Sequence, residues 1–169
     1  MIYKQDSIAN APEQYIIHGC NAQSVMGSGV AKTLRDKWPA IFAPYITHLK
    51  QFPRRADALG SHCFAQIEPN KFVVNAITQV NYGRMPGVKY ASPAAISNVL
   101  FTLAESLTPF EGVAPTIASS KIGCGLGGLN WVDIVKIYQT VETITGVEFV
   151  IYDNQPSSPV VGPDASTLF

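Results

Sequence analysis

Short apolar runs alternate along this chain with longer segments in which apolar residues recur every three or four positions. The short runs predict buried strands at residues 15–18, 62–67, 72–77, 116–118 and 147–152. The longer segments predict helices over residues 30–38, 43–51, 93–107 and about 130–145. Strands that alternate with helices are typical of an α/β sheet that is covered by helices on both faces.

The helix predicted over residues 93–107 has the clearest start and the clearest apolar face. Ser92 is a good N-cap, and Pro93 has the fixed φ that suits a first helical position. The residues that would face the core follow at intervals of three and four: Ile96, Val99, Leu100, Leu103 and Leu107.

Length and composition indicate a single globular domain. The 169 residues are 47% hydrophobic and 14% charged, which is sufficient apolar material for a core. We expect the domain to cover residues 1–155 and a flexible tail, rich in Pro, Ser and Gly, to cover 156–169. Because 12 basic residues balance 12 acidic ones, no broad surface for nucleic acid is expected. A nucleotide-sized ligand stays open, since a few backbone amides can bind phosphate.

The cysteines and the N-terminus indicate a cytoplasmic protein with no membrane partner. Cys20, Cys63 and Cys124 lack paired spacing, which favours a reducing compartment over a disulfide scaffold or a zinc cage. Residues 1–6 contain no long apolar run, so no signal peptide is expected. No segment approaches the roughly 20 apolar residues that span a bilayer. The histidines and acids show no metal-ligand spacing, so no metal or cofactor is expected.

A glycine-rich segment follows the first predicted strand and opens the next helix. It begins His18-Gly19-Cys20-Asn21 and ends Gly27-Ser28-Gly29-Val30. Small residues at 27–29 would let the backbone approach a phosphate, and the helix would add the positive end of its dipole. Glycine also serves turns that need a positive φ, so this segment alone leaves both interpretations open.

A second glycine-rich segment separates the predicted strand at 116–118 from the last helix. It reads Ser119-Ser120-Lys121-Ile122-Gly123-Cys124-Gly125-Leu126-Gly127-Gly128-Leu129-Asn130-Trp131. Its glycines are too many for one tight turn, and the interleaved Ile122, Leu126 and Leu129 argue against a flexible connector. Ligands of α/β sheets bind beyond the carboxyl ends of the strands, so the two segments could hold a diphosphate from both sides. Neither has the motif of an ATP-binding or dinucleotide-binding loop.

Together these segments resemble the macro domain family. Ile17-His18-Gly19-Cys20-Asn21 with Gly27-Ser28-Gly29-Val30-Ala31 is similar to that family's strand, asparagine and GGGVA-like turn. Ile122-Gly123-Cys124-Gly125-Leu126 with Gly128-Leu129-Asn130-Trp131 is similar to its second loop, and Asn75-Ala76-Ile77-Thr78-Gln79 with Tyr82-Gly83-Arg84 to phosphatase-like members in microbes and phages. The resemblance extends from Ile2 to about Asn154. It is nearest to the branch of the terminal ADP-ribose glycohydrolase and the yeast-type ADP-ribose 1″-phosphate phosphatase.

The resemblance implies a three-layer α/β/α fold with a mixed central sheet, and an ADP-ribose-type ligand. It implies that Asp6 accepts a hydrogen bond from the adenine amino group, that Asn21 contacts the distal ribose and that Tyr152 stacks on adenine. The residues implied to hold the diphosphate are Gly27, Ser28, Gly29, Val30, Ser120, Gly123, Cys124, Gly125 and Leu126. Without the resemblance, Asp6 and Asn21 could be turn residues and Tyr152 a core residue.

Two departures from the family pattern bear on activity. The glycohydrolase branch has an aspartate directly after Gly-Cys-Gly-Leu and a lysine after the strand before the long helix. Here Gly127 occupies the first position, and no lysine follows Ile77 until Lys89, so a lysine–aspartate mechanism is not expected. His18 is the remaining acid–base candidate, because imidazole titrates near neutral pH and the yeast-type phosphatase has a histidine in a similar position. It could equally be a structural residue at a strand end.

The expected function is therefore binding of ADP-ribose or a derivative, with removal of the terminal phosphate from ADP-ribose 1″-phosphate. Arg84 follows a predicted strand end and could bind that phosphate in bidentate fashion, or lie exposed in a loop. A binding module without turnover and a hydrolase of another ADP-ribose linkage are the alternatives. If the chain is encoded by a phage, its compartment would be the host cytoplasm.

Overall fold

A computed structural model of the chain describes residues 1–107 and 113–154, so the tail predicted for 156–169 lies outside the described residues. The strands are β1 (Ile2–Lys4), β2 (Tyr15–Asn21), β3 (His62–Glu68), β4 (Lys71–Gln79), β5 (Thr116–Ser119) and β6 (Glu148–Tyr152). The α-helices are α1 (Gly29–Lys37), α2 (Phe42–Leu49), α3 (Pro93–Ser106) and α4 (Trp131–Thr145). Short 3-10 helices cover Ile8–Asn10, Pro39–Ile41 and Arg55–Ala58.

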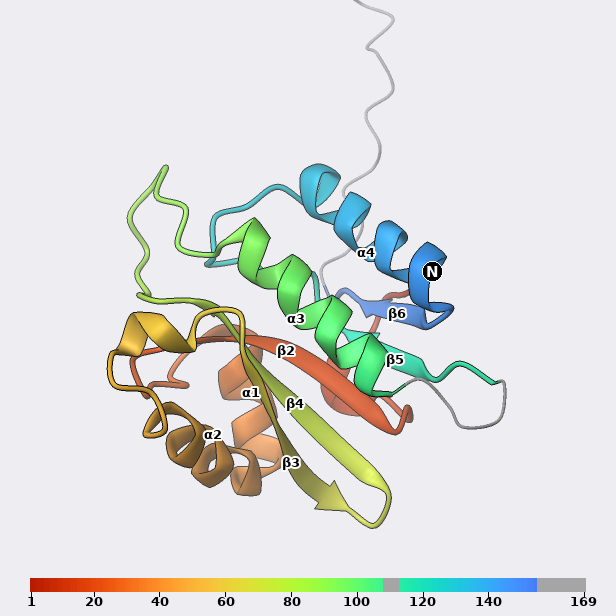
Figure 1. Cartoon of the computed structure of the whole chain (residues 1–169), viewed down its shortest axis with the longest axis horizontal. Helices are drawn as coiled ribbons and strands as arrows, with labels where there is room; N and C mark the ends of the chain where they lie inside the picture. Colours follow the sequence, from red (N-terminus) through yellow and green to blue (C-terminus); the bar gives the residue numbers. More distant parts are fainter. Residues whose placement is uncertain (108–112, 155–169) are drawn as a thin grey trace, which may run out of the picture.

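The strands form one mixed sheet in the order β1-β6-β5-β2-β4-β3. Neighbouring strands run parallel except for the antiparallel pair of β3 and β4. The carboxyl ends of β2, β4, β5 and β6 therefore meet at one edge of the sheet, from which the chain continues into loops (Figure 1).

Helices cover both faces of this sheet (Figure 1). α1 and α2 pack on one face, where Leu34 of α1 shares a buried cluster with Ile16 of β2. α3 and α4 pack on the other face, where Leu100 of α3 shares a second cluster with Ile17. Successive strand residues point to opposite faces, so adjacent isoleucines serve two different cores. This arrangement confirms the predicted three-layer α/β/α fold with a mixed central sheet.

The predicted helix at 93–107 is confirmed as α3. The Ser92 hydroxyl accepts a hydrogen bond from the backbone N–H of Ala95 at 3.2 Å, and Pro93 occupies the first turn. No helix within residues 1–107 and 113–154 is long and apolar enough to cross a membrane.

The most consequential difference from the sequence prediction lies in β2, which runs to Asn21 instead of ending at His18. The additional residues pair with β4, where Gly19 lies opposite Ala76. Gly19 obscured this extension, because glycine weakens the pattern of a strand. The position has little room for a side chain, since a Cβ on Gly19 would lie 2.8 Å from Oγ1 of Thr78.

Candidate functional site

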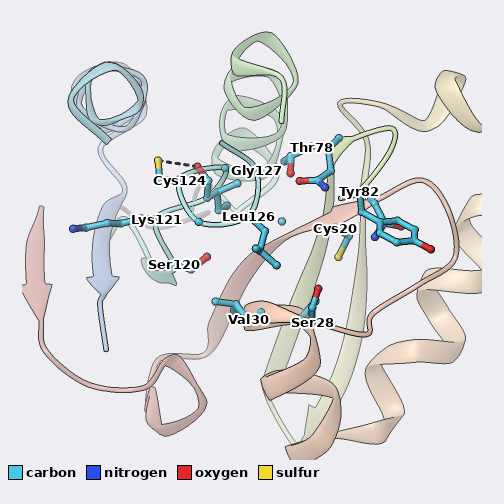
Figure 2. Close-up of a pocket in the computed structure, with 18 of the residues that line it drawn as sticks. Cys20, Ser28, Val30, Thr78, Tyr82, Ser120, Lys121, Cys124, Leu126 and Gly127 are labelled. Atoms are coloured by element: carbon cyan, nitrogen blue, oxygen red, sulfur yellow. Dashed lines mark hydrogen bonds between the residues drawn. The ribbon is translucent and has the colours of Figure 1, made fainter. Parts of the chain in front are cut away.

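A cavity of about 1350 Å³ lies at the edge of the sheet where β2, β4, β5 and β6 end. The loops that follow these four strands and the first turns of α1 and α4 form its walls (Figure 2). Both glycine-rich segments contribute to it. A Cβ placed on Gly29 would lie 3.9 Å from the Leu126 side chain, so the two loops approach each other across the cavity.

Most residues that the sequence singled out lie together in these walls. Those of the first loop are Asn21, Gly27, Ser28, Gly29 and Val30, and those of the second are Ser120, Gly123, Cys124, Gly125 and Leu126. Figure 2 shows Ser28 and Val30 of the first loop below Leu126 and Gly127 of the second loop. Arg84 and Tyr152 also line the cavity, whereas His18 and Asp6 do not.

Two of the wall glycines have no structural reason to be glycine. A Cβ on Gly125 would meet nothing within 4 Å, and one on Gly27 would meet only the Val25 side chain at 3.6 Å. Neither residue has a positive φ, so an L side chain would be compatible with the backbone. Without side chains at these two positions, the backbone is open to the cavity.

Gly127 is different, although it lies only two positions after Gly125. A Cβ there would lie 2.6 Å from the carbonyl oxygen of Gly123 and 2.9 Å from Cβ of Ala91. The Gly127 carbonyl oxygen accepts hydrogen bonds from the N–H groups of Tyr90 and Ala91 at 2.9 and 3.1 Å. The Gly127 carbonyl group therefore connects the second loop to the segment before α3 by hydrogen bonds, and the position has no space for a side chain.

The Asn21 side chain lines the cavity but is engaged within its own loop. Its Nδ2 donates to the carbonyl oxygen of Val25 at 2.9 Å, and its Oδ1 accepts from the N–H of Gln23 at 2.9 Å. Both ends of the amide thus stabilise the turn that leads to Gly27. Contact of Asn21 with a ribose stays a prediction.

His18 lies outside the cavity wall and is completely buried. Its Nε2 lies 2.7 Å from Oδ1 of Asn75, and Sγ of Cys20 lies 3.6 Å from the same nitrogen. Burial lowers the pKa of His18 to about 4, so the ring is neutral at pH 7. This geometry contradicts the expectation that His18 exchanges a proton with a ligand. The reason is that β2 continues to Asn21, which leaves His18 in mid-strand with its side chain in the core.

Asp6 is exposed and lies close to the Tyr152 part of the cavity. Its Oδ1 accepts from the N–H of Ser7 at 2.7 Å and from Nδ2 of Asn10 at 2.9 Å, and these bonds lower its pKa. Tyr152 is 5% exposed, and its hydroxyl donates to the Glu13 carboxylate. Burial, then Glu13 and finally the Asp6 charge raise the pKa of Tyr152, which indicates that Asp6 is nearby.

Sequence reasoning missed an ion pair in the wall. Nζ of Lys121 lies 2.7 Å from Oδ2 of Asp153, and both residues line the cavity. The same lysine lies 5.7 Å from the ring centroid of Trp131. The signal was available in the sequence, because both residues follow the ends of strands that meet at the same edge of the sheet.

The wall also contains two thiols and an exposed rim. Burial raises the pKa of Cys124 to about 11 and raises that of Cys20 well above its usual value, so both thiols stay protonated at pH 7. Neither is therefore an activated nucleophile.

Tyr82 is 55% exposed and Arg84 is exposed, and both line the cavity from the segment after β4.

Comparison with known proteins identifies the fold of this chain. No family model matches the chain. It is 32% identical over 144 residues to an uncharacterised 17.5 kDa protein of Enterobacteria phage T4, which covers 83% of this chain and 86% of that protein. The solved macrodomain of Mycobacterium tuberculosis DarG superposes with a TM-score of 0.74 at 22% identity, over 91% of this chain and 97% of that one. The chain has the macrodomain fold, and it belongs to the same family as the phage T4 protein. This confirms the resemblance seen in the two glycine loops.

Other relatives of this macrodomain are named for an activity or were solved with a ligand. The ADP-ribose 1″-phosphate phosphatase of Aspergillus fumigatus is 52% identical over 33 residues, 20% of this chain and 16% of that protein. The DNA ADP-ribosyl glycohydrolase of Mycobacterium tuberculosis is 22% identical over 151 residues, 89% of this chain and 41% of that protein. Thermosipho africanus DarTG in complex with ADP-ribose superposes with a TM-score of 0.68 at 20% identity, over 87% of this chain and 39% of that one.

Proposed function

We propose that this macrodomain binds ADP-ribose, or a nucleotide that contains it, in the cavity at the carboxyl edge of the sheet. The observation that carries the proposal is the pair of Gly27 and Gly125. Both line the cavity, and neither packing nor backbone conformation requires glycine at either position. A ligand that comes close to the backbone on both sides would explain why glycine occupies these two positions.

A diphosphate suits this position electrostatically. Among the hydrogen bonds of residues 1–107 and 113–154, none has the N–H of Gly125 or Leu126 as its donor. Backbone N–H groups without a protein acceptor bind anions readily. The N-terminus of α1 begins at Gly29 in the opposite wall and adds its dipole. Binding of this kind requires no excess of basic residues, in agreement with the net charge of zero.

The relatives agree with this ligand. The Thermosipho africanus protein that was solved with ADP-ribose shares the fold over 87% of this chain. The fungal phosphatase and the mycobacterial glycohydrolase are both named for activities that involve ADP-ribose. These similarities favour ADP-ribose over other nucleotides with a diphosphate.

Within the cavity we assign the adenine to the part lined by Tyr152. Both local hydrogen bonds of Asp6 use Oδ1, so Oδ2 would accept from the adenine amino group. The distal ribose would lie toward Asn21, which holds the turn before Gly27 in place. Arg84, on the rim, would contact a phosphate on that ribose.

For the reaction we propose hydrolysis of ADP-ribose 1″-phosphate, which the local identity of 52% to the fungal phosphatases favours. Water would attack the phosphorus, the bond between phosphorus and the ribose 1″ oxygen would break, and that oxygen would take up a proton. Arg84 and backbone N–H groups would stabilise the charge on the phosphoryl oxygens. His18 takes no part, because it is buried and neutral.

A second candidate is hydrolysis of another ADP-ribose linkage, which the longer match to the DNA ADP-ribosyl glycohydrolase favours. This chain would need different catalytic groups from the lysine–aspartate pair. Gln79 ends β4 with no lysine beside it, and Gly127 has no space for the aspartate side chain.

Calorimetric titration with ADP-ribose, with AMP and NAD in parallel, tests the binding. Selective heat with ADP-ribose supports the proposal, and no heat with any of the three refutes it. Release of inorganic phosphate from ADP-ribose 1″-phosphate, compared with release of ADP-ribose from ADP-ribosylated DNA, then tests the reaction. Turnover of the DNA substrate alone would refute the phosphatase activity and support the glycohydrolase activity. Tight binding without turnover of either would make the chain a binding module.

A further inference from the structure

Two buried tyrosine hydroxyls, one from each helical layer, contact the starts of the two glycine loops. Tyr45 of α2 and Tyr138 of α4 are both 0% exposed, and neither lines the cavity. We propose that they are positioning residues that order the two loops before a diphosphate binds. The proposal rests on the proposed function, because it concerns the same cavity.

The Tyr45 hydroxyl closes the turn at the start of the first loop. It donates to the backbone oxygen of Asn21 at 2.7 Å, with Oδ1 of the same residue at 3.0 Å. It also accepts from the N–H of Val25 at 3.2 Å. One hydroxyl therefore joins both ends of the turn, and the glycine segment and the first turn of α1 follow directly. The position of Tyr45 on α2 thus determines where the amides of residues 27–30 lie.

The Tyr138 hydroxyl acts at the corresponding place in the second loop. It lies 2.7 Å from Oγ of Ser119 and donates to the backbone oxygen of Ser120 at 3.2 Å. That carbonyl oxygen also accepts from Oγ of Ser119 at 2.7 Å and from the N–H of Ile122 at 2.9 Å. Three donors thus converge on one carbonyl group at the point where β5 ends and the loop begins. This network fixes the direction in which the second loop leaves the sheet.

Both hydroxyls keep their protons at any pH used for an assay. Burial raises the pKa of Tyr45 and of Tyr138 well above the usual range. The contacts of the two hydroxyls therefore do not change with pH. They affect ligand binding by ordering the two loops. A loop that is held in place beforehand loses less conformational entropy when it binds. The two tyrosines would raise affinity for ADP-ribose without touching it.

The test compares Tyr45→Phe and Tyr138→Phe with Thr145→Val as the control. Each tyrosine variant keeps the packed ring and removes one hydroxyl. Thr145 lies at the end of α4 away from the cavity, where its hydroxyl donates to the backbone oxygen of Val141 at 2.7 Å. The control therefore loses one hydroxyl and its hydrogen bond at a place that contacts neither loop. Amide hydrogen exchange is measured without ligand, and the Kd for ADP-ribose is measured by calorimetry.

We expect Tyr45→Phe to speed exchange over residues 22–30 only and Tyr138→Phe to speed it over 121–129 only. Each should weaken ADP-ribose binding about tenfold, the size of effect that one lost hydrogen bond has. Thr145→Val should change neither measurement. If Tyr138→Phe does not fold, Ser119→Ala removes the hydroxyl's partner instead.

Unchanged exchange in both loops would overturn the proposal, and so would faster exchange with unchanged affinity. A loss of affinity equal to that of Thr145→Val would also overturn it, because the effect would then be one of general stability. If the wild-type chain binds no ADP-ribose, the proposed function fails. The exchange experiment needs no ligand, so it would still decide whether the hydroxyls order the loops.

Discussion

Replacing Gly125 with valine should separate ligand binding from folding more cleanly than any other single change in the cavity. No heavy atom lies within 4 Å of the added Cβ, and the φ of Gly125 is not positive. We therefore expect the free energy of unfolding to change by less than about 1 kcal/mol. The valine side chain would instead occupy the space beside the backbone into which the diphosphate is proposed to fit.

The magnitude follows from the hydrogen bonds that a displaced diphosphate would lose. Backbone N–H groups that bind a charged oxygen contribute about 1.5–3 kcal/mol each. Loss of the two bonds offered by Gly125 and Leu126 would cost about 3–6 kcal/mol, which raises the Kd by about 150-fold to 20,000-fold. Gly125→Ala adds a single methyl group and should have a smaller effect in the same direction.

Calorimetry with ADP-ribose and thermal unfolding without ligand are the two assays. The expected pair of results is a large loss of affinity at an unchanged melting temperature. An affinity within about threefold of wild type, with the fold intact, would refute the argument that a ligand explains the glycine at this position.

Three further predictions concern the same region. Gly127→Ala should lower the free energy of unfolding by about 1–3 kcal/mol in urea titrations, because its Cβ would lie 2.6 Å from a carbonyl oxygen; stability equal to wild type would contradict this. The pKa of His18 is about 4 in the folded chain and about 6.5 in the unfolded chain, so the unfolded chain binds the extra proton between these two pH values. Stability should therefore be complete above pH 6.5 and fall toward pH 4 by up to about 3 kcal/mol, and His18→Gln should flatten this dependence. Arg84→Ala should raise KM for ADP-ribose 1″-phosphate about tenfold and leave the Kd for ADP-ribose unchanged. If Arg84→Ala weakened the binding of both ligands equally, Arg84 would not contact the terminal phosphate.

The sequence by itself determined the helices, the alternation of elements and the two loops that form the cavity. Ser92, Pro93 and the apolar residues behind them define α3, because capping and helical spacing act over a few neighbouring residues. The glycine content of the two loops is equally local. Together with the rule that parallel strands share a carboxyl edge, it was enough to bring the loops together.

The tertiary structure decided what individual residues in those loops do. Gly125 and Gly127 look equivalent in the sequence, yet one faces the open cavity and the other packs against Gly123 and Ala91. The difference arises because the folded loop brings Gly123 against Gly127, and Ala91 approaches from a segment that is distant in sequence. No local pattern carries that information.

The role of His18 was also decided by tertiary contacts. The apolar run suggested that the first strand ends at this residue, where its side chain would reach a ligand. Pairing with β4 extends β2 to Asn21 instead, and Asn75 of that strand binds the imidazole in the core. The end of a strand depends on its partner, and the burial of a side chain depends on the layer packed above it. Both are set by residues far away in the chain, so only the folded structure determines them.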